Sequence, residues 1–327
     1  MKNKNITRGC LIGGAAGDAL GYTVEFCDEQ QIFDRFGENG ITEYMLTNGK
    51  ALISDDTQMT MFTAEGLISA DGDYTGGIRR AYRDWYITQT TKRPDKADRS
   101  CLLQMPEMYS RRAPGLTCMC AIEEGAKGSV AVPVNDSKGC GGIMRIAPVG
   151  LFFSGSSMDI ICSDMLAAEA AAVTHGHELG YIPAAALAHI IRMVCEGAPL
   201  KTAAADSISA MEQLFPDALH IGEFKEIMEL AVSLSEQNVD DLDAIHQLGA
   251  GWVAEETLAV AVYCSLKYEN DIEKALTAAV NHGGDSDSTG AVTGNILGAY
   301  LGYEAIPQKF REHLELHDEI VSLADKL

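Results

Sequence analysis

Two short stretches of the sequence place carboxylates and hydroxyls side by side: SDDT at 54–57 and DSDS at 285–288. Carboxylates this close repel one another unless a positive group lies between them. Their hard oxygen atoms are the ligands that Mg²⁺ and Mn²⁺ prefer, and neither stretch contains the His or Cys typical of zinc sites. The two stretches therefore predict a pair of divalent cations. Such a pair can align a water molecule for attack, which indicates a hydrolase.

Helix capping is the alternative interpretation of both stretches. Each precedes a segment with helical periodicity, and Ser and Asp are preferred N-cap residues whose partial or full negative charge suits the positive end of a helix. One side chain is enough for a cap, whereas each stretch offers two carboxylates and at least one hydroxyl. The sequence alone leaves both interpretations open.

Glycine recurs at every fourth position in two segments. The ridges are Gly9, Gly13, Gly17 and Gly21 near the N-terminus, and Gly290, Gly294, Gly298 and Gly302 near the C-terminus. Residues four apart lie along one side of a helix, and a Gly inside a helix costs about 1 kcal/mol relative to Ala. We therefore expect two central helices that approach other helices closely. The alternatives are dimerisation in a membrane, against which Asp18 argues, and chance in a chain with 32 glycines.

Stretches rich in Ala and Leu, which are strong helix formers, fill much of the chain. They include 164–173, 184–194, 224–234, 254–266 and 272–280. Another helix is expected after Asp56, ending before Asp71 and Gly72. The strand-like stretch 130–135 is short and is broken by Pro133. Because no linker divides the sequence, we predict one all-α domain, residues 1–327, with about a dozen helices.

Composition limits the class of protein. Of the 327 residues, 46% are hydrophobic, and the net charge is 25 − 47 = −22. Such an acidic surface repels phosphate backbones, so we expect no nucleic-acid binding. The apolar N-terminal segment is interrupted by Asp18 and several glycines, which argues against a signal peptide, and no stretch suits a membrane span. Nine cysteines without a CxxC pair favour reduced thiols in a cytoplasmic protein, and we expect a monomer.

Five stretches, in order along the chain, resemble the motifs of the ADP-ribosylglycohydrolase family. They are GCLIGGAAGDALG (9–21), SDDTQMT (54–60), KGCGGIMRIAPVG (138–150), THGHELGY (174–181) and HGGDSDSTGAVTGNILGAYLG (282–302). The resemblance covers nearly the whole chain, and five ordered motifs are much more specific than any one of them. It implies an all-α fold around a binuclear magnesium or manganese site. It also implies hydrolysis of the bond that joins ADP-ribose to a modified side chain.

The resemblance further implies roles for the acidic residues. The metal ligands would be Ser54, Asp55, Asp56, Asp285, Asp287 and Ser288, and the catalytic residues would be Glu25, Asp55, Asp56 and Asp287. Glu25 matches a position that gates the site and moves a proton from the bridging water or to the leaving nitrogen; the alternative is a solvated loop carboxylate. Asp18 is interpreted as a buried carboxylate that packs helices and not as a ligand.

Substrate contacts are expected from two loops and two single residues. The loops contribute Gly115 and Thr117, which open a helix, and Ser137, Gly139, Cys140, Gly141 and Gly142, whose backbone can approach a ligand closely. His175 matches a position near the adenosine ribose. Trp252 is expected either to stack on adenine or to pack in the core. Arg145 is interpreted as a partner in a structural salt bridge, with a phosphate contact as the alternative.

The sequence thus predicts a metal-dependent hydrolase that removes ADP-ribose from modified protein, with closest resemblance to members that act on ADP-ribosyl-arginine. Serine-linked, nucleic-acid-linked and small-molecule conjugates are alternative substrates. A non-catalytic ADP-ribose-binding protein is a second class, although it would be expected to lack one of the acidic residues present here. A third is a dinuclear phosphoesterase, which would cleave the pyrophosphate and release AMP.

Overall fold

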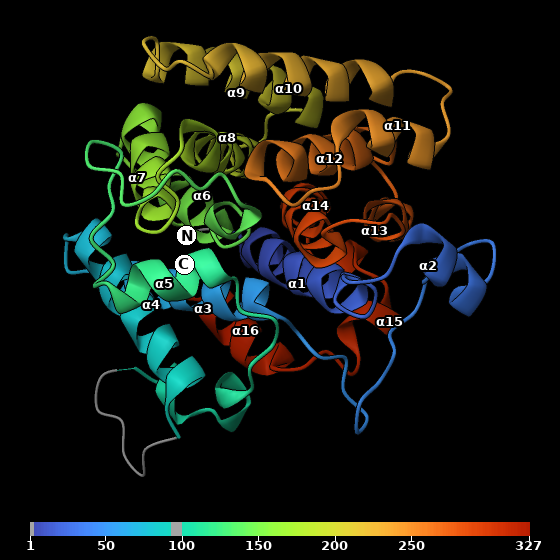
Figure 1. Cartoon of the computed structure of the whole chain (residues 1–327), viewed down its shortest axis with the longest axis horizontal. Coiled ribbons are helices and arrows are strands. Elements are labelled where there is room, and N and C mark those ends of the chain that lie inside the picture. The colour runs from blue at the N-terminus through green and yellow to red at the C-terminus, as the bar shows by residue number, and fades with distance from the viewer. Residues whose placement is uncertain (1–2, 93–99) are drawn as a thin grey trace.

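The chain folds into sixteen α-helices and four short 3-10 helices in the computed structural model, which describes residues 3–92 and 100–327 (Figure 1). The α-helices are α1 (Lys4–Gly21), α2 (Glu29–Phe36), α3 (Asp55–Ile68), α4 (Tyr74–Thr90), α5 (Leu116–Glu123), α6 (Ala147–Phe153), α7 (Ile160–Ala172), α8 (Glu178–Cys195), α9 (Leu200–Leu214), α10 (Ile221–Ser235), α11 (Asp241–Leu248), α12 (Ala254–Lys267), α13 (Ile272–Val280), α14 (Ser286–Leu301), α15 (Gln308–Arg311) and α16 (His317–Ala324). The 3-10 helices are η1 (Leu102–Gln104), η2 (Pro106–Tyr109), η3 (Cys140–Gly142) and η4 (Tyr303–Ala305). Within these residues only isolated β-bridges occur and no strand forms, so the all-α prediction is confirmed.

Helices α1 and α14 lie side by side in the middle of the molecule, and their glycines make this contact possible (Figure 1). A Cβ atom added to Gly13 would lie 2.3 Å from the carbonyl oxygen of Gly294, and one added to Gly17 would lie 2.0 Å from that of Gly290. Gly9 faces Gly298 in the same way. The pairing is antiparallel, since the residue number rises in α1 as it falls in α14. The expectation of close helix packing through glycine is therefore confirmed.

The end of the second ridge differs from the expectation. Gly302 is not inside α14 but is its C-cap, with φ 85°, a conformation that favours glycine and ends the helix. The residue that faces Gly21 of α1 is Ser286 and not a glycine. A Cβ atom added to Gly21 would lie 2.2 Å from the carbonyl oxygen of Ser286. The close contact thus continues to the last residue of α1 and the first residue of α14, so these two ends are held together.

Helix α8 is the second structural centre. It packs against α6, α7, α9, α12 and α14. Among the described residues it is the one helix long and apolar enough to cross a membrane, but 83% of that stretch is buried inside the protein. Within this fold α8 is therefore a core helix. It connects the α9–α12 side of the molecule to the central α1–α14 pair.

The periodicity of the sequence located the longer helices well. The expected helices at 254–266 and 272–280 correspond to α12 and α13, and 224–234 corresponds to α10. The helix expected after Asp56 is α3, and the positive φ angles of Asp71 and Gly72, 48° and 90°, follow its end. The structure contains more helices than the dozen expected, because short ones such as α2 and α15 span too few residues to show an apolar period.

Candidate active site

Asp18, in the last turn of α1, fixes the start of α3. Its buried carboxylate accepts hydrogen bonds from the backbone N–H groups of Ser54 (2.9 Å) and Thr57 (3.0 Å) and from the Thr57 hydroxyl. The Ser54 hydroxyl in turn accepts the N–H of Asp56 at 3.2 Å and so caps α3. Both Asp18 oxygens are thus occupied in holding α1 to α3, as expected of a carboxylate that packs helices.

The start of α14 is joined directly to the start of α3. The hydroxyl of Ser288 donates to Asp56 Oδ1 at 2.9 Å, which links the two acidic stretches that lie 232 residues apart in the sequence. Asp285 stands at the N-cap position of α14, yet its side chain makes no capping hydrogen bond. The capping interpretation therefore holds for Ser54 but not for Asp285, whose Oδ2 instead accepts a hydrogen bond from Cys140 Sγ at 2.7 Å.

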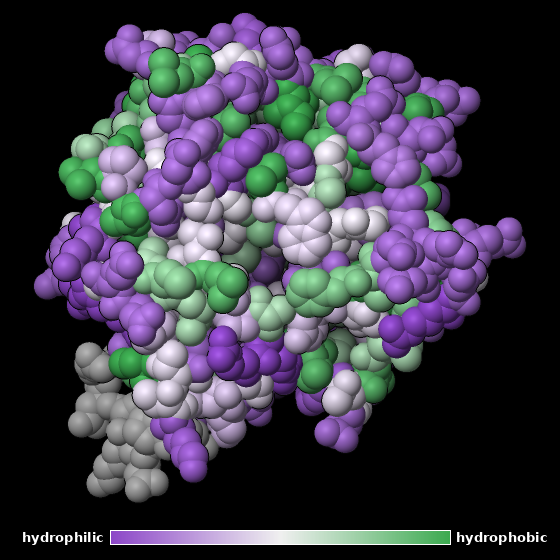
Figure 2. All heavy atoms as spheres, in the orientation of Figure 1, coloured by the Kyte–Doolittle hydropathy of each residue, from purple (hydrophilic) through white to green (hydrophobic). Residues whose placement is uncertain are grey.

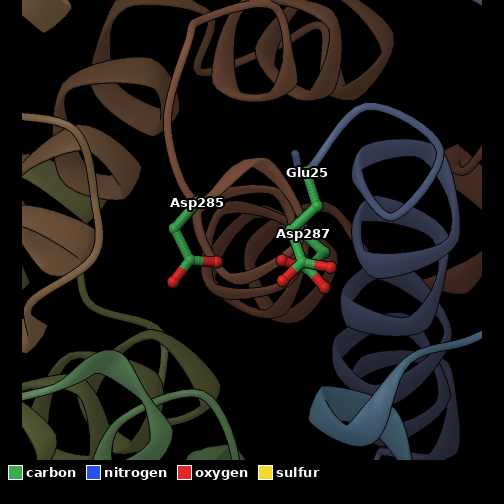
Figure 3. A group of neighbouring side chains, drawn as sticks. All are labelled: Glu25, Asp285 and Asp287. Carbon is green, nitrogen blue, oxygen red and sulfur yellow. The ribbon is translucent and has the colours of Figure 1, made fainter. Parts of the chain in front are cut away.

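Glu25 completes the acidic centre from the loop that follows α1. One oxygen atom of its carboxylate lies within 4.8 Å of an oxygen atom of Asp285 and of Asp287. In Figure 3 the carboxylates of Glu25 and Asp287 overlap in the view, and that of Asp285 lies beside them. Glu25 is only 8% exposed, and its Oε2 has no hydrogen-bond partner. Glu25 is therefore not a solvated loop carboxylate.

Burial and mutual repulsion dominate the electrostatics of this centre. The pKa of Glu25 is raised to about 9, by burial first and then by the charges of Asp285 and Asp55. Burial and neighbouring carboxylates also raise the pKa values of Asp56 and Asp287 well above their ordinary range. Among the described residues, none of these groups forms an ion pair with a Lys or Arg side chain.

These observations fit a metal site. A buried carboxylate cluster without a cationic partner is costly, and Oε2 of Glu25, a member of the cluster, has no hydrogen-bond partner. The residues placed to hold divalent cations are Asp55, Asp56, Asp285, Asp287 and Glu25, with Ser288 beside Asp56. When bound, such cations would neutralise the carboxylates, polarise oxygen atoms and activate water.

A cavity of about 420 Å³ opens over the acidic centre and gathers most of the expected substrate residues. Its lining includes Gly115, Thr117, Gly139, Cys140, Gly141, His175 and Trp252, together with Glu25, Asp55, Asp56, Asp285, Asp287 and Ser288. Figure 2 shows a hollow near the centre of this face, surrounded by pale and green atoms, whereas purple atoms dominate the outer edge. Among the expected residues, Ser54, Ser137 and Gly142 do not line the cavity. Ser54 lies buried beneath the cavity and Gly142 packs against α8.

Backbone contacts hold the two expected binding loops in place. The N–H of Cys140 donates to the carbonyl oxygen of Trp252 at 3.2 Å, and Gly139 forms an isolated bridge with Val253. On the other wall, the N–H of Gly115 donates to Asp55 Oδ2 at 3.2 Å. This N–H group is therefore already paired with a carboxylate in the absence of substrate.

His175 lies behind the glycine-rich loop in a chain of hydrogen bonds. Arg145 Nη2 donates to Thr174 Oγ1 at 2.6 Å, and Thr174 Oγ1 is 2.8 Å from His175 Nδ1. Burial, and then the charge of Arg145, lower the pKa of His175 to about 3, so the ring is neutral. Since Arg145 can only donate, Thr174 Oγ1 accepts its hydrogen bond, and the Thr174 hydroxyl has two neighbours, His175 Nδ1 at 2.8 Å and the carbonyl oxygen of Ala171 at 3.5 Å. The other ring nitrogen, Nε2, lies on the side of Gly139 and Gly141.

The salt bridge expected for Arg145 is wrong. Arg145 is fully buried and forms no ion pair with any residue of the described ranges. Its guanidinium lies 4.2 Å from the centre of the Tyr82 ring and is bonded to Thr174. The sequence could not show this, because the aromatic partner comes from α4, far away in the chain. Arg145 is structural, but through a cation–π contact and hydrogen bonds.

The core-packing alternative for Trp252 is also wrong, since 43% of this side chain is exposed at the cavity mouth. The residue that sequence reasoning missed is its neighbour Phe26, which is 73% exposed. The two rings are stacked, with centroids 6.3 Å apart. Phe26 directly follows Glu25, and this adjacency was the signal that could have identified it.

The fold and site together define a hydrolase that carries its carboxylates beneath a ligand-sized cavity. The family model described as ADP-ribosylglycohydrolase matches residues 2–327. The chain belongs to this family and is an enzyme that hydrolyses ADP-ribosyl bonds.

Three similar proteins illustrate the relationship. ADP-ribosylhydrolase ARH3 of Bos taurus is 24% identical over 350 residues, which cover 98% of this chain and 91% of the relative. ADP-ribosylarginine hydrolase Tri1 of Serratia proteamaculans is 25% identical over 325 residues, covering 98% of this chain and 78% of its own. A solved structure, described as an ADP-ribosylglycohydrolase-related protein complex, superposes with a TM-score of 0.66 at 24% identity and covers 99% of this chain and 96% of its own. The solved structure supports the fold.

Proposed function

We propose that this protein hydrolyses the N-glycosidic bond between ADP-ribose and an arginine side chain of a modified protein. The carbon–nitrogen bond breaks, water supplies a hydroxyl to the ribose carbon and a proton to the nitrogen, and ADP-ribose and unmodified arginine leave. Glu25 is the residue placed to move the proton, because its buried carboxylate faces the acidic centre and lines the cavity.

The observation that carries the arginine proposal is the charge of the cavity. Five carboxylates line it and no Lys or Arg does. With two divalent cations bound, the four ionised aspartates balance them, −4 + 4 = 0, so the cavity gains no net positive charge. A guanidinium leaving group is positive and suits this environment, whereas the hydroxyl of serine carries no charge. The relative named ADP-ribosylarginine hydrolase supports the same substrate.

Other parts of the proposal rest on composition and chemistry. We propose two divalent cations, Mg²⁺ or Mn²⁺, since the candidate ligands are oxygen atoms of carboxylates and hydroxyls. We also propose a monomer in the cytoplasm. All nine cysteines are free thiols in the structure, which supports a reducing compartment. The strong negative charge supports a modified protein, not a nucleic acid, as the substrate carrier.

Mass spectrometry of the products tests the proposal. Peptides that carry ADP-ribose on arginine or on serine are incubated side by side with the protein and either divalent cation. We expect intact ADP-ribose and unmodified arginine peptide. AMP and a phosphoribosyl peptide would instead show a phosphoesterase, and binding of ADP-ribose without any product would show a non-catalytic protein. Turnover of the serine peptide alone would contradict the proposed acceptor.

A further inference from the structure

Two aromatic side chains lie exposed at the mouth of the cavity. Phe26 and Trp252 are 73% and 43% exposed, and their planes are inclined by only 23° with ring centroids 6.3 Å apart. Exposed large aromatic rings beside a ligand cavity are typical of binding surfaces. The hydrolysis chemistry described above uses neither ring, so their function is a separate question.

Both rings are attached to the acidic centre by their neighbours in the chain. Phe26 directly follows Glu25. Trp252 follows Gly251, where an added Cβ would lie 3.5 Å from the Cβ of Asp285. The aromatic pair therefore flanks the end of the cavity where the glycosidic bond must be cleaved. The loop around Trp252 is fixed there, because Glu256 accepts hydrogen bonds from the N–H groups of Ala250 (3.0 Å) and Gly251 (3.1 Å).

The chemistry at this place selects a planar cation. The face of an aromatic ring attracts a guanidinium group, and the carboxylates beneath add attraction of the same sign. No Lys or Arg lines the cavity to compete for the rings. A hydroxyl leaving group such as serine offers no flat surface and no charge.

We propose that Phe26 and Trp252 form the acceptor subsite, which holds the guanidinium of the modified arginine while its bond to ribose is cleaved. This inference rests on the proposed function. Phe26 is the specificity-determining residue, since it combines the greater exposure with direct attachment to Glu25. The pair thus serves the leaving group and not the adenine for which Trp252 was considered from the sequence.

The test compares Phe26→Ala and Phe26→Tyr with the wild type on both ADP-ribosyl peptides. We expect Phe26→Ala to lower kcat/KM for the arginine peptide about tenfold, as the loss of a cation–π contact predicts, and Phe26→Tyr to stay within about threefold of the wild type. For Phe26→Ala, any residual turnover of the serine peptide and the Kd of ADP-ribose from calorimetry should change by less than about twofold. Leu219→Ala, which removes another exposed apolar side chain (87%), is the matched control and should change nothing.

Each other outcome contradicts a different claim. If wild-type protein does not release ADP-ribose from the arginine peptide, the proposed function fails and the subsite fails with it. If the wild type does so but Phe26→Ala weakens ADP-ribose binding, the ring serves the nucleotide. If Phe26→Ala lowers turnover of both peptides equally, it acts by disturbing Glu25. If it changes neither, the ring has no role in recognition. The last three outcomes overturn the acceptor subsite alone.

Discussion

Glu25 is the residue whose surroundings most clearly indicate chemistry. It is buried, lacks a partner for Oε2 and has a pKa raised to about 9 by burial and by Asp285 and Asp55. Glu25→Gln keeps the shape but cannot move a proton, so turnover should fall about 100-fold or more. ADP-ribose affinity, measured by calorimetry, should change much less. Full turnover of the variant would reduce Glu25 to a structural carboxylate.

His175 should make stability depend on pH. Its folded pKa of about 3 lies below the ordinary value of 6.5, so between these values the unfolded chain binds a proton that the folded ring does not. The contribution of His175 to the free energy of unfolding is therefore fully present above about pH 6.5 and is lost as the pH falls toward 3. His175→Gln should show a smaller loss of unfolding free energy between pH 7 and pH 5 in denaturant titrations. Equal losses in both proteins would show that His175 is protonated in the fold.

At the scale of the elements, the contact between α1 and α14 should tolerate no side chain. A Cβ on Gly294 would lie 1.9 Å from the carbonyl oxygen of Gly13, a backbone atom that cannot move aside alone. We expect Gly294→Ala to lower the free energy of unfolding by on the order of 1–3 kcal/mol or more. Turnover should fall too, because this contact holds Glu25 against Asp287.

Gly222→Ala is the matched control for that variant. Gly222 is also inside a helix, α10, but an added Cβ would meet nothing within 4 Å. Alanine is the better helix former there, so Gly222→Ala should be as stable as the wild type or slightly more stable in thermal unfolding. Equal melting temperatures for Gly294→Ala and the wild type would contradict the close central packing.

The elements also show which features a sequence can predict. The spacing of the glycines identified the contact face of α1 and of α14. A four-residue period can be recognised in one segment without knowing which helix packs against it. It could not give the register, and so could not show that Gly21 meets Ser286 and that Glu25 thereby reaches Asp287. Likewise, the charge of Arg145 suggested a salt bridge, but its partners Tyr82 and Thr174 are brought to it only by the tertiary fold.

At the scale of the whole molecule, the fold brings carboxylates from both ends of the chain into one cavity. Of the two exposed rings at the cavity mouth, Trp252 was expected from the sequence and Phe26 was not. Whether Phe26 is buried or exposed depends on how the loop after α1 leaves the core, and no local pattern encodes that. The acidic centre could be predicted because its closely spaced aspartates are visible in the sequence itself, whatever the fold around them.

We propose that divalent cations hold this acidic centre together. Such cations should bind the folded chain alone, because the unfolded chain cannot assemble ligands from residues as far apart as Asp56 and Asp287. At a metal concentration 100 times the Kd, each independent site stabilises the fold by about 2.7 kcal/mol. Metal-free Asp287→Ala should be no less stable than metal-free wild type, since the change also removes a repelling charge.

The most direct test measures melting temperature and ADP-ribose release on the same sample, before chelation, after it and after addition of Mg²⁺ or Mn²⁺. For the wild type, both quantities should fall together on chelation and recover together on metal addition. Asp287→Ala should be inactive in all three states. Full ADP-ribose release by wild-type protein stripped of metal, with an unchanged melting temperature, would contradict a metal-dependent active site.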